Sequence, residues 1–359
     1  MKKILVTGSG GPAGVNTLRS LGISPEKMVL YSSDINVYHL EFSRPYAKEV
    51  FLVPRCTQPE FVPKINEIVE KHKIELIIPQ PDIEVAILSE KREKFNASVF
   101  LPKKETVKIC QDKFRSAKIW KKQGFPTVKA IEIKKDNVEN DLEQAFSMLG
   151  DNLWIRAKRG AGGTGSTPAD NIKTATSWIN YWYSREKDWE FIAQEFLPGR
   201  NIAFQSVFNN GECVTSQARE RLEYIYPYLA PSGITGTPVV AKTIHDDEVN
   251  KISTNAILSI DPNATGIFSV DLKEDKSGNI VPTEINAGRF FTTNFFYAFA
   301  GKEHNSPRAN MAHILVKLAY KESIPEGNNY NVLPADLYWI RHIDCSQHLV
   351  QEKNLQYNP

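Results

Sequence analysis

The segment Phe268–Arg289, with the sequence FSVDLKEDKSGNIVPTEINAGR, decides the fold because it reads as two strands joined by a tight turn. A turn centred on Ser277–Gly278 sets Asp271 directly opposite Glu284 across the hairpin. Asn286 falls on the same face as Glu284, because side chains alternate along a strand. The segment therefore predicts a hairpin that gathers three oxygen-bearing side chains on one face.

The opposite face of this hairpin is apolar, which supports the same pairing; its residues are Phe268, Val270, Leu272 and Ile285. Two carboxylates that face each other repel, so the arrangement is costly unless a proton or a cation lies between them. Oxygen ligands with room for water are what Mg²⁺ prefers, usually with nucleotide phosphates completing its coordination. The alternative is a solvated hairpin face that carries acidic residues by chance.

Upstream, Arg156–Ser166 (RAKRGAGGTGS) is a glycine-rich turn between a predicted strand and a predicted helix. Such a turn offers N–H groups and a helix dipole to a phosphate. Side-chain alternation puts Arg156 and Lys158 on one face of the strand, and Arg159 adds a third cation. The lysine and Ser/Thr ending of a Walker loop is missing. We predict a site for the phosphates of a nucleoside triphosphate, with a mobile surface loop as the alternative.

A second glycine-rich turn, Gly8–Gly14 (GSGGPAG), follows the first predicted strand. It fits the G-x-G-x-x-G dinucleotide pattern poorly, and Pro12 lacks an N–H group. Asp34 stands about where a ribose-binding acid is expected. We interpret this turn as a structural or substrate-lining element, and a dinucleotide site is the alternative.

The order of the predicted elements divides the chain into four parts. Residues 1–102 alternate short apolar strands with helices, which is typical of a Rossmann-like domain with a parallel sheet. Residues 103–189 open with a helical pattern from Glu105 to Gln123, ended by Gly124, and contain the phosphate turn. Residues 190–320 read as antiparallel hairpins. Residues 321–359 hold one late strand and a polar tail.

The 359-residue chain carries a formal net charge of +2 and 41% hydrophobic residues, which is ordinary for a globular enzyme. It has no basic stripe for nucleic acid and no apolar run near the ~20 residues that span a bilayer. Its four cysteines are far apart and have no metal or disulfide spacing. We expect a soluble cytoplasmic protein without a nucleic-acid or membrane partner, and a homodimer is left open.

Taken in order, these segments resemble the ATP-grasp superfamily, and more narrowly the single-copy relatives of the carbamoyl phosphate synthetase large subunit. The resemblance covers roughly residues 1–320. It rests on the pair Asp112–Lys113, the strand and turn IRAKRGAGGTG, the segment AQEFLPG, and the hairpin ending EIN followed by an arginine. It implies an α/β fold in which a Rossmann-like pre-ATP-grasp domain precedes a two-lobed α+β ATP-grasp domain, with a small lobe at 103–189 and a large lobe at 190–320.

The resemblance also implies ATP and one or two Mg²⁺ ions, or Mn²⁺ in their place, as cofactors. Nucleotide-binding residues would be Lys113, Arg156, Lys158, Gly162, Gly163, Gly165, Gln194, Glu195, Phe196, Leu197 and Asn201. Metal ligands would be Asp271, Glu284 and Asn286, and Arg289 would be catalytic, facing the transferred phosphate.

The sequence departs from the family pattern at three positions. Gln194 stands where the family often has an acid, and Asn201 where a carboxylate or histidine is common near the ribose. Arg289 follows the hairpin asparagine after two residues instead of one.

The resemblance implies an ATP-dependent ligase that phosphorylates a carboxylate to an acyl phosphate and joins it to an amine or similar nucleophile, releasing ADP and phosphate. For the small-molecule substrates we select Asp82 and Glu84, which follow a predicted parallel strand. We add Arg219 and Arg221, which share a strand face and suit an anion. Helix capping and exposed strand charges are the respective alternatives.

Three other functions are weighed against this one. An ATP-binding regulatory protein would keep the fold without turnover. An NAD-dependent oxidoreductase would use Gly8–Gly14 and leave the carboxylate hairpin unexplained. A carbamoyl phosphate synthetase proper would need duplicated halves, and this chain has one.

Overall fold

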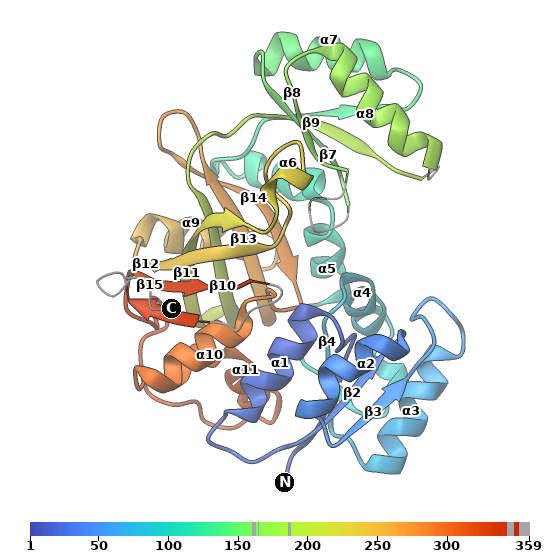
Figure 1. Ribbon diagram of the computed structural model, residues 1–359, viewed down its shortest axis with the longest axis vertical. Coiled ribbons are helices and arrows are strands. Elements are labelled where there is room, and N and C mark those ends of the chain that lie inside the picture. Colours follow the sequence, from blue (N-terminus) through green and yellow to red (C-terminus); the bar gives the residue numbers. More distant parts are fainter. Residues whose placement is uncertain (160–162, 164, 186–187, 343–347, 352–359) are drawn as a thin grey trace.

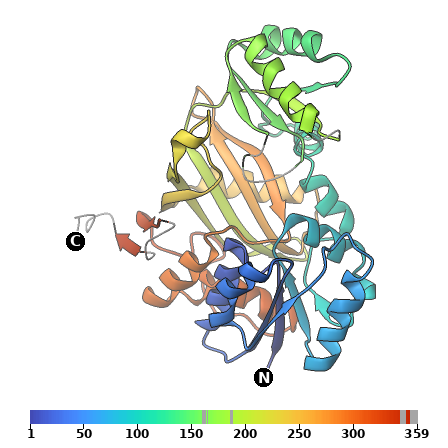
Figure 2. The same ribbon diagram turned by 45° about the vertical axis from the view of Figure 1, so that its right-hand side comes forward.

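The computed structural model describes residues 1–159, 163, 165–185, 188–342 and 348–351. Figures 1 and 2 show three units along the long axis of the molecule, with the largest sheet between the N-terminal domain and a small lobe. Among the described residues, no helix is long and apolar enough to cross a membrane.

The N-terminal domain is built on a five-stranded parallel sheet in the order β3-β2-β1-β4-β5. Its strands are β1 (Lys3–Thr7), β2 (Val29–Asp34), β3 (Glu49–Leu52), β4 (Leu76–Pro79) and β5 (Ser98–Val99). Its helices are α1 (Pro12–Gly22), α2 (Val37–Ser43), α3 (Phe61–His72) and α4 (Asp82–Glu90). The apolar runs of β1 and β4 are buried, as expected of parallel strands covered on both faces. The predicted Rossmann-like arrangement is confirmed.

The small lobe holds a four-stranded antiparallel sheet in the order β6-β9-β7-β8. Its strands are β6 (Ala130–Ile133), β7 (Leu153–Ala157), β8 (Thr167–Ala169) and β9 (Phe191–Glu195), and its helices are α7 (Val138–Leu149) and α8 (Ile172–Arg185). β9 follows the predicted boundary at residue 190, yet it pairs with β6 and β7 and so belongs to this sheet.

Two helices, α5 (Lys104–Cys110) and α6 (Lys113–Lys122), replace the single helix expected over this segment. The break occurs because the Asp112 side chain accepts a hydrogen bond from the Arg115 N–H at 2.9 Å and caps a new helix. Trp120 of α6 is fully buried and donates to the Ala256 carbonyl of α9. α6 and the end of α5 therefore pack in the core of the large sheet, and Val107 of α5 packs in that of the N-terminal domain, although both helices lie within the predicted small-lobe range.

The large sheet has the order β14-β13-β10-β11-β12-β15-β16. Its strands are β10 (Asn201–Asn209), β11 (Glu212–Tyr224), β12 (Pro238–Ile244), β13 (Gly266–Glu274), β14 (Ile280–Ala287), β15 (Leu337–Ile340) and β16 (His348–Gln351). The accompanying helices are α9 (Asp247–Leu258), α10 (Asn294–Glu303) and α11 (Met311–Ala319). α10 and α11 pack against α1, so the N-terminal domain and the large sheet share one core.

The decisive hairpin is β13–β14, and its register agrees with prediction where the polar residues lie. Asp271 faces Glu284, and Ser269 faces Asn286. Nearer the turn the register shifts by one residue, because the turn closes between Asp275 and Asn279 and a bulge follows. The predicted apolar face is buried throughout, with Phe268, Val270, Leu272 and Ile285 at most 2% exposed.

Candidate active site

A cavity of about 480 Å³ lies where the three units meet. The predicted site residues that line it are Asp82, Arg156, Gly163, Gln194, Glu195, Phe196, Leu197, Asn201, Arg219, Arg221, Asp271, Glu284, Asn286 and Arg289. Lys113 lies beside it, with its Nζ 3.3 Å from Glu284 Oε2. Gly162 falls outside the described residues. The cavity thus gathers side chains from segments far apart in the chain.

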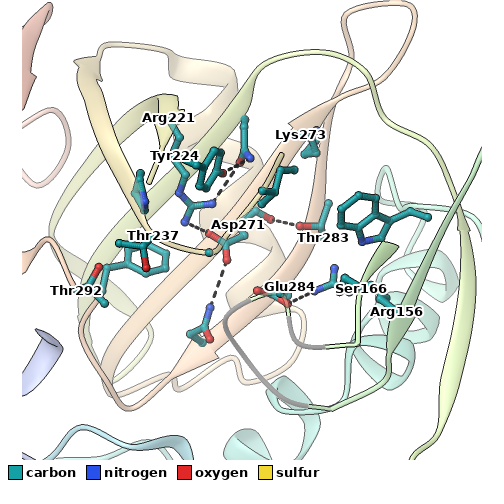
Figure 3. A pocket seen from close by; sticks show the side chains of 18 of the residues that line it. Arg156, Ser166, Arg221, Tyr224, Thr237, Asp271, Lys273, Thr283, Glu284 and Thr292 are labelled. Atoms are coloured by element: carbon teal, nitrogen blue, oxygen red, sulfur yellow. Dashed lines mark hydrogen bonds and ion pairs between the residues drawn. The ribbon is translucent and has the colours of Figure 1, made fainter. Parts of the chain in front are cut away.

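The two hairpin carboxylates each have a cationic partner (Figure 3). Asp271 Oδ1 accepts a hydrogen bond from Arg221, and Asp271 Oδ2 lies 3.5 Å from the Asn286 amide nitrogen. Glu284 Oε2 accepts a 2.6 Å bond from Arg156 Nη2, and Lys113 approaches the same oxygen. The hairpin polar groups therefore converge on one space, and cations from β7, β11 and α6 offset the repulsion between the acids.

The two carboxylates differ in their electrostatic surroundings. Burial raises the pKa of Asp271 to about 6, and the nearby Glu284 adds to the shift while Arg221 opposes it. Burial alone would also raise the pKa of Glu284, but Lys113 and Arg156 outweigh it and hold that pKa well below its usual range. Glu284 is accordingly the more firmly ionised member of the pair.

The donor set suits a hard divalent cation that arrives with phosphates. It consists of oxygen atoms of two carboxylates and one amide, which match Mg²⁺ and are too few for a cage made of protein alone. The described residues contain no group of three or more His, Cys, Asp or Glu side chains that could hold a metal ion. The residues present fit a metal whose remaining ligands come from a nucleotide and water.

Lys113 is buried to 5% exposure at the first turn of α6. Its backbone N–H donates to the carbonyl of Lys158, which ties this turn to the end of β7. Burial lowers the pKa of Lys113, and Glu284 opposes that shift. A lysine that is so little exposed to solvent is suited to bind an anion that enters the cavity.

The other end of the cavity is more apolar. Leu197 packs with Val128 and Val281, and Trp154 and Phe196 line the same region. Gln194 is buried, and its amide nitrogen has no hydrogen-bond partner within the described chain. An apolar slot with an unpaired donor and strand backbone beside it suits a planar heterocyclic base.

Arg289 reaches the hairpin despite the extra residue before it. Gly288 adopts φ +89°, a left-handed conformation, and a Cβ atom there would lie 2.5 Å from Val85. This glycine turn lets Arg289 Nη2 donate to Asn286 Oδ1 at 2.5 Å, while its Nε donates to Asp82. The arginine is held between the large sheet and the N-terminal domain.

The placement of Lys158 in the phosphate site is wrong. Lys158 follows directly after the last residue of β7, Ala157, and its backbone N–H donates to the Glu190 carbonyl at 2.9 Å. Lys158 Nζ instead contacts Glu132 at 2.6 Å and Glu190 at 3.0 Å. It does not line the cavity.

Gly165 also lies away from the cavity lining. Its carbonyl accepts a hydrogen bond from Trp178 Nε1 at 3.0 Å, and it sits against Trp189. We infer that Gly165 anchors the end of the turn to the aromatic side chains of the small lobe.

Replacing Gly165 with alanine should destabilise the protein by roughly 2–4 kcal/mol, because φ is +73° and a Cβ would lie 2.6 Å from the Trp189 ring. Gly124→Ala is the matched control, since Gly124 has φ +75° and no atom within 4 Å of the added Cβ. It should cost only about 1–2 kcal/mol. Urea unfolding measures both values, and equal losses would contradict the packing argument.

The N-terminal glycine turn is closed by its own neighbours. Gly10 N–H donates to Asp34 Oδ2 at 2.9 Å, so the acid that a ribose would need is bound to the turn itself. A Cβ at Gly8 would meet Pro81 at 2.2 Å, and one at Gly10 would meet His39 at 2.3 Å. This packing supports the structural interpretation of the turn over a dinucleotide site.

Glu84 does not reach the cavity either, and its selection as a substrate residue is corrected. It lies in the first turn of α4, is 3% exposed, and accepts a hydrogen bond from the Thr7 hydroxyl of β1. Burial raises its pKa to about 7 from an ordinary 4.5, and Asp34 adds to the shift. Its neighbour Asp82 does line the cavity.

Glu84→Gln is expected to stabilise the protein at pH 8 relative to wild type but not at pH 5. Because the pKa of Glu84 is higher in the folded state, its contribution to the free energy of unfolding of the wild type is fully present below about pH 4.5. That contribution is lost as the pH rises towards 7. The difference in free energy of unfolding between variant and wild type should therefore grow by up to about 3 kcal/mol between pH 5 and pH 8. Urea unfolding at the two pH values measures this gap, and a constant gap would refute a buried titrating carboxyl.

Several cavity residues escaped the sequence analysis, among them Gln80, Tyr224, Phe291 and Thr292. Gln80 is 3% exposed, and neither amide atom has a hydrogen-bond partner in the described chain. Its position directly after β4, at the carboxyl end of a parallel strand, was the available signal. The other three have no local sequence signal, because the fold alone brings them to the cavity.

The parallel N-terminal sheet and the two antiparallel sheets around the cavity agree with the folds of solved structures, which confirms the predicted α/β fold class. The chain also matches a family model described as PylC-like, N-terminal domain, over residues 40–100. Sequence comparison with curated proteins gives no match.

Three similar structures illustrate the range of this fold. The biotin carboxylase domain of the Hydrogenobacter thermophilus 2-oxoglutarate carboxylase, in complex with MgADP, ADP and bicarbonate, is 15% identical with a TM-score of 0.67 over 94% of this chain and 73% of that one. Carboxyaminoimidazole ribonucleotide synthase from Aspergillus clavatus, complexed with ATP, is 14% identical with a TM-score of 0.70 over 94% and 81%. The L-amino acid ligase from Bacillus licheniformis is 13% identical with a TM-score of 0.65 over 94% and 80%.

Proposed function

We propose that the protein is an ATP-dependent ligase that activates a carboxylate and joins it to an amine or similar nucleophile. The observation that carries the proposal is the convergence of Asp271, Glu284 and Asn286 in one cavity with Lys113, Arg156 and Arg289 around them. Solved relatives of the fold that are ligases or bind ATP, ADP or MgADP support it.

The nucleotide would lie across the cavity. Its base would occupy the slot beside Gln194, Leu197 and Trp154, with Asn201 near the ribose. Its phosphates would extend towards Arg156 and Lys113. When bound, Mg²⁺ would neutralise phosphate charge beside the hairpin oxygens.

The chain needs no protein nucleophile for this reaction. Arg289 would stabilise negative charge on the transferred phosphoryl group while the substrate carboxylate attacks in line. The amine would then attack the carbonyl carbon of the acyl phosphate, and phosphate would leave as the new bond forms. The partly enclosed cavity would limit the access of water to that intermediate.

ADP release from Mg-ATP, measured across a panel of amino acids, sugar acids and phosphorylated carboxylates, tests the proposal. We expect at least one acid to stimulate ADP release, with a further increase when its amine partner is added. Nucleotide binding is followed separately by the shift in unfolding temperature with Mg-ATP. Binding without stimulation by any acid would favour an ATP-binding protein without turnover.

A further inference from the structure

The arginine-rich end of the cavity is separate both from the apolar slot and from the side that holds Arg156. Figure 3 shows Thr237 and Thr292 on one side of Asp271, and Arg156 with Ser166 on the other. Arg219 lines this end together with Phe291. It is the part of the cavity that the proposed nucleotide would leave free.

The acids that line the cavity near these arginines already have cationic partners. Glu284 pairs with Arg156 and Lys113, and Asp271 pairs with Arg221. Asp82 pairs with Arg289. Arg219 has no ion pair with a carboxylate of the described chain, and Asp271, which is paired with Arg221, acts on it only through space.

Arg219 is buried to 1% exposure, which makes this charge costly. Its Nη1 donates to the Thr293 hydroxyl, its guanidinium lies 5.2 Å from the Phe291 ring centre, and its Nε has no hydrogen-bond partner within the described residues. Burial lowers its pKa to about 10, and Arg221 adds to the shift. A buried arginine with an unpaired donor is suited to an anion that is absent from the protein itself.

A second arginine reinforces the same end. Arg341 Nη2 donates to the Thr292 hydroxyl at 3.3 Å, and its Nε donates to the Pro238 carbonyl at 3.1 Å. Burial lowers the pKa of Arg341 to about 10, and the nearby Arg219 adds to the shift. Two arginines that repel each other without a described acid between them favour an anionic ligand.

We propose that this end of the cavity, lined by Arg219 and Thr292 and supported by their contacts with Thr293 and Arg341, binds a second anionic group of the acid substrate. The inference rests on the proposed function, because it places the reacting carboxylate near Arg289 and the second anion near Arg219. The substrate class is then a dicarboxylate or a phosphorylated carboxylate. The single negative charge of a simple monocarboxylate would leave Arg219 uncompensated.

Direct anion binding tests the subsite without turnover. The protein is first saturated with Mg²⁺ and a non-hydrolysable ATP analogue, so that the phosphates shield Arg289 and Lys113. Calorimetric titration then uses inorganic phosphate and malonate as probes, with acetate and chloride at matched ionic strength. Phosphate and malonate should bind to wild type, and Arg219→Gln and Arg341→Gln should weaken that binding about 10- to 100-fold.

Arg200→Gln is the matched control, because Arg200 has two carboxylate partners, Glu274 and Asp246, and does not line the cavity. It should leave the anion affinity unchanged. Arg341→Gln decides the test if Arg219→Gln fails to fold. Anion binding that is missing in wild type, or equal in wild type and Arg341→Gln, would overturn the proposal.

Turnover with matched acids gives a second readout and separates the subsite from the ligase function. The pairs are butyrate with succinate and glycerate with phosphoglycerate, so that both dicarboxylates and phosphate esters are represented. Where a pair is active, the dianionic acid should have the higher kcat/KM, and Arg341→Gln should remove most of that advantage. Failure of every acid to stimulate ADP release counts against the ligase function alone, because the anion titration still decides the subsite.

Discussion

Glu284→Gln is expected to lower the rate of Mg-ATP-dependent ADP formation by roughly 10²–10³-fold. The carboxylate is a proposed Mg²⁺ ligand and also the shared partner of Arg156 and Lys113. A neutral amide would bind a hard cation more weakly, and it would leave a buried lysine without its acid. The activity loss should therefore come with a higher Mg²⁺ concentration for half-maximal rate.

Glu132→Gln is the matched control for this variant. Glu132 also pairs with a lysine, Lys158, at 2.6 Å, but the pair lies outside the cavity lining. Its loss should change ADP formation little, since a partly exposed pair contributes about 0–1 kcal/mol to stability. Similar activity in Glu284→Gln and wild type, with both variants folded, would remove the hairpin from the proposed mechanism.

The hairpin was predictable because its determinants are local. Alternation of apolar and polar residues along β13 and β14, with Gly278 in the turn, sufficed to place Asp271 opposite Glu284. The bulge nearer the turn was not predictable, since it depends on how the turn between Asp275 and Asn279 closes. The polar face kept its register because the shift lies on the far side of Asp271.

Errors and omissions arose where long-range contacts decide the outcome. Lys158 was misplaced because its two acidic partners, Glu132 and Glu190, come from other segments that local sequence patterns cannot position. Arg219 and Arg221 share a strand face as predicted, yet only Arg221 contacts Asp271. That difference depends on β10, which lies between β11 and β13 and which local sequence patterns cannot position.

Arg289→Ala should lower kcat by roughly 10²–10³-fold while changing the affinity for Mg-ATP far less. Arg289 is fixed by Asn286 and Asp82, not by a group in the proposed base slot. Its role would therefore appear mainly when charge develops on the transferred phosphoryl group. Steady-state kinetics with the best acid from the panel, together with the Mg-ATP shift in unfolding temperature, separates kcat from binding.

Arg289→Lys distinguishes charge from geometry. Lysine keeps the positive charge but lacks the planar fork that lets one side chain contact Asn286 and Asp82 together, so we expect only partial activity. Asp82→Asn leaves Arg289 in place with its contact to Asn286 and changes one anchor of the arginine, itself a group of the cavity lining, so it should cost less than Arg289→Ala. Equal losses in Asp82→Asn and Arg289→Ala would instead indicate that Arg289 acts by joining the N-terminal domain to the large sheet, and its assignment to the transferred phosphate would be wrong.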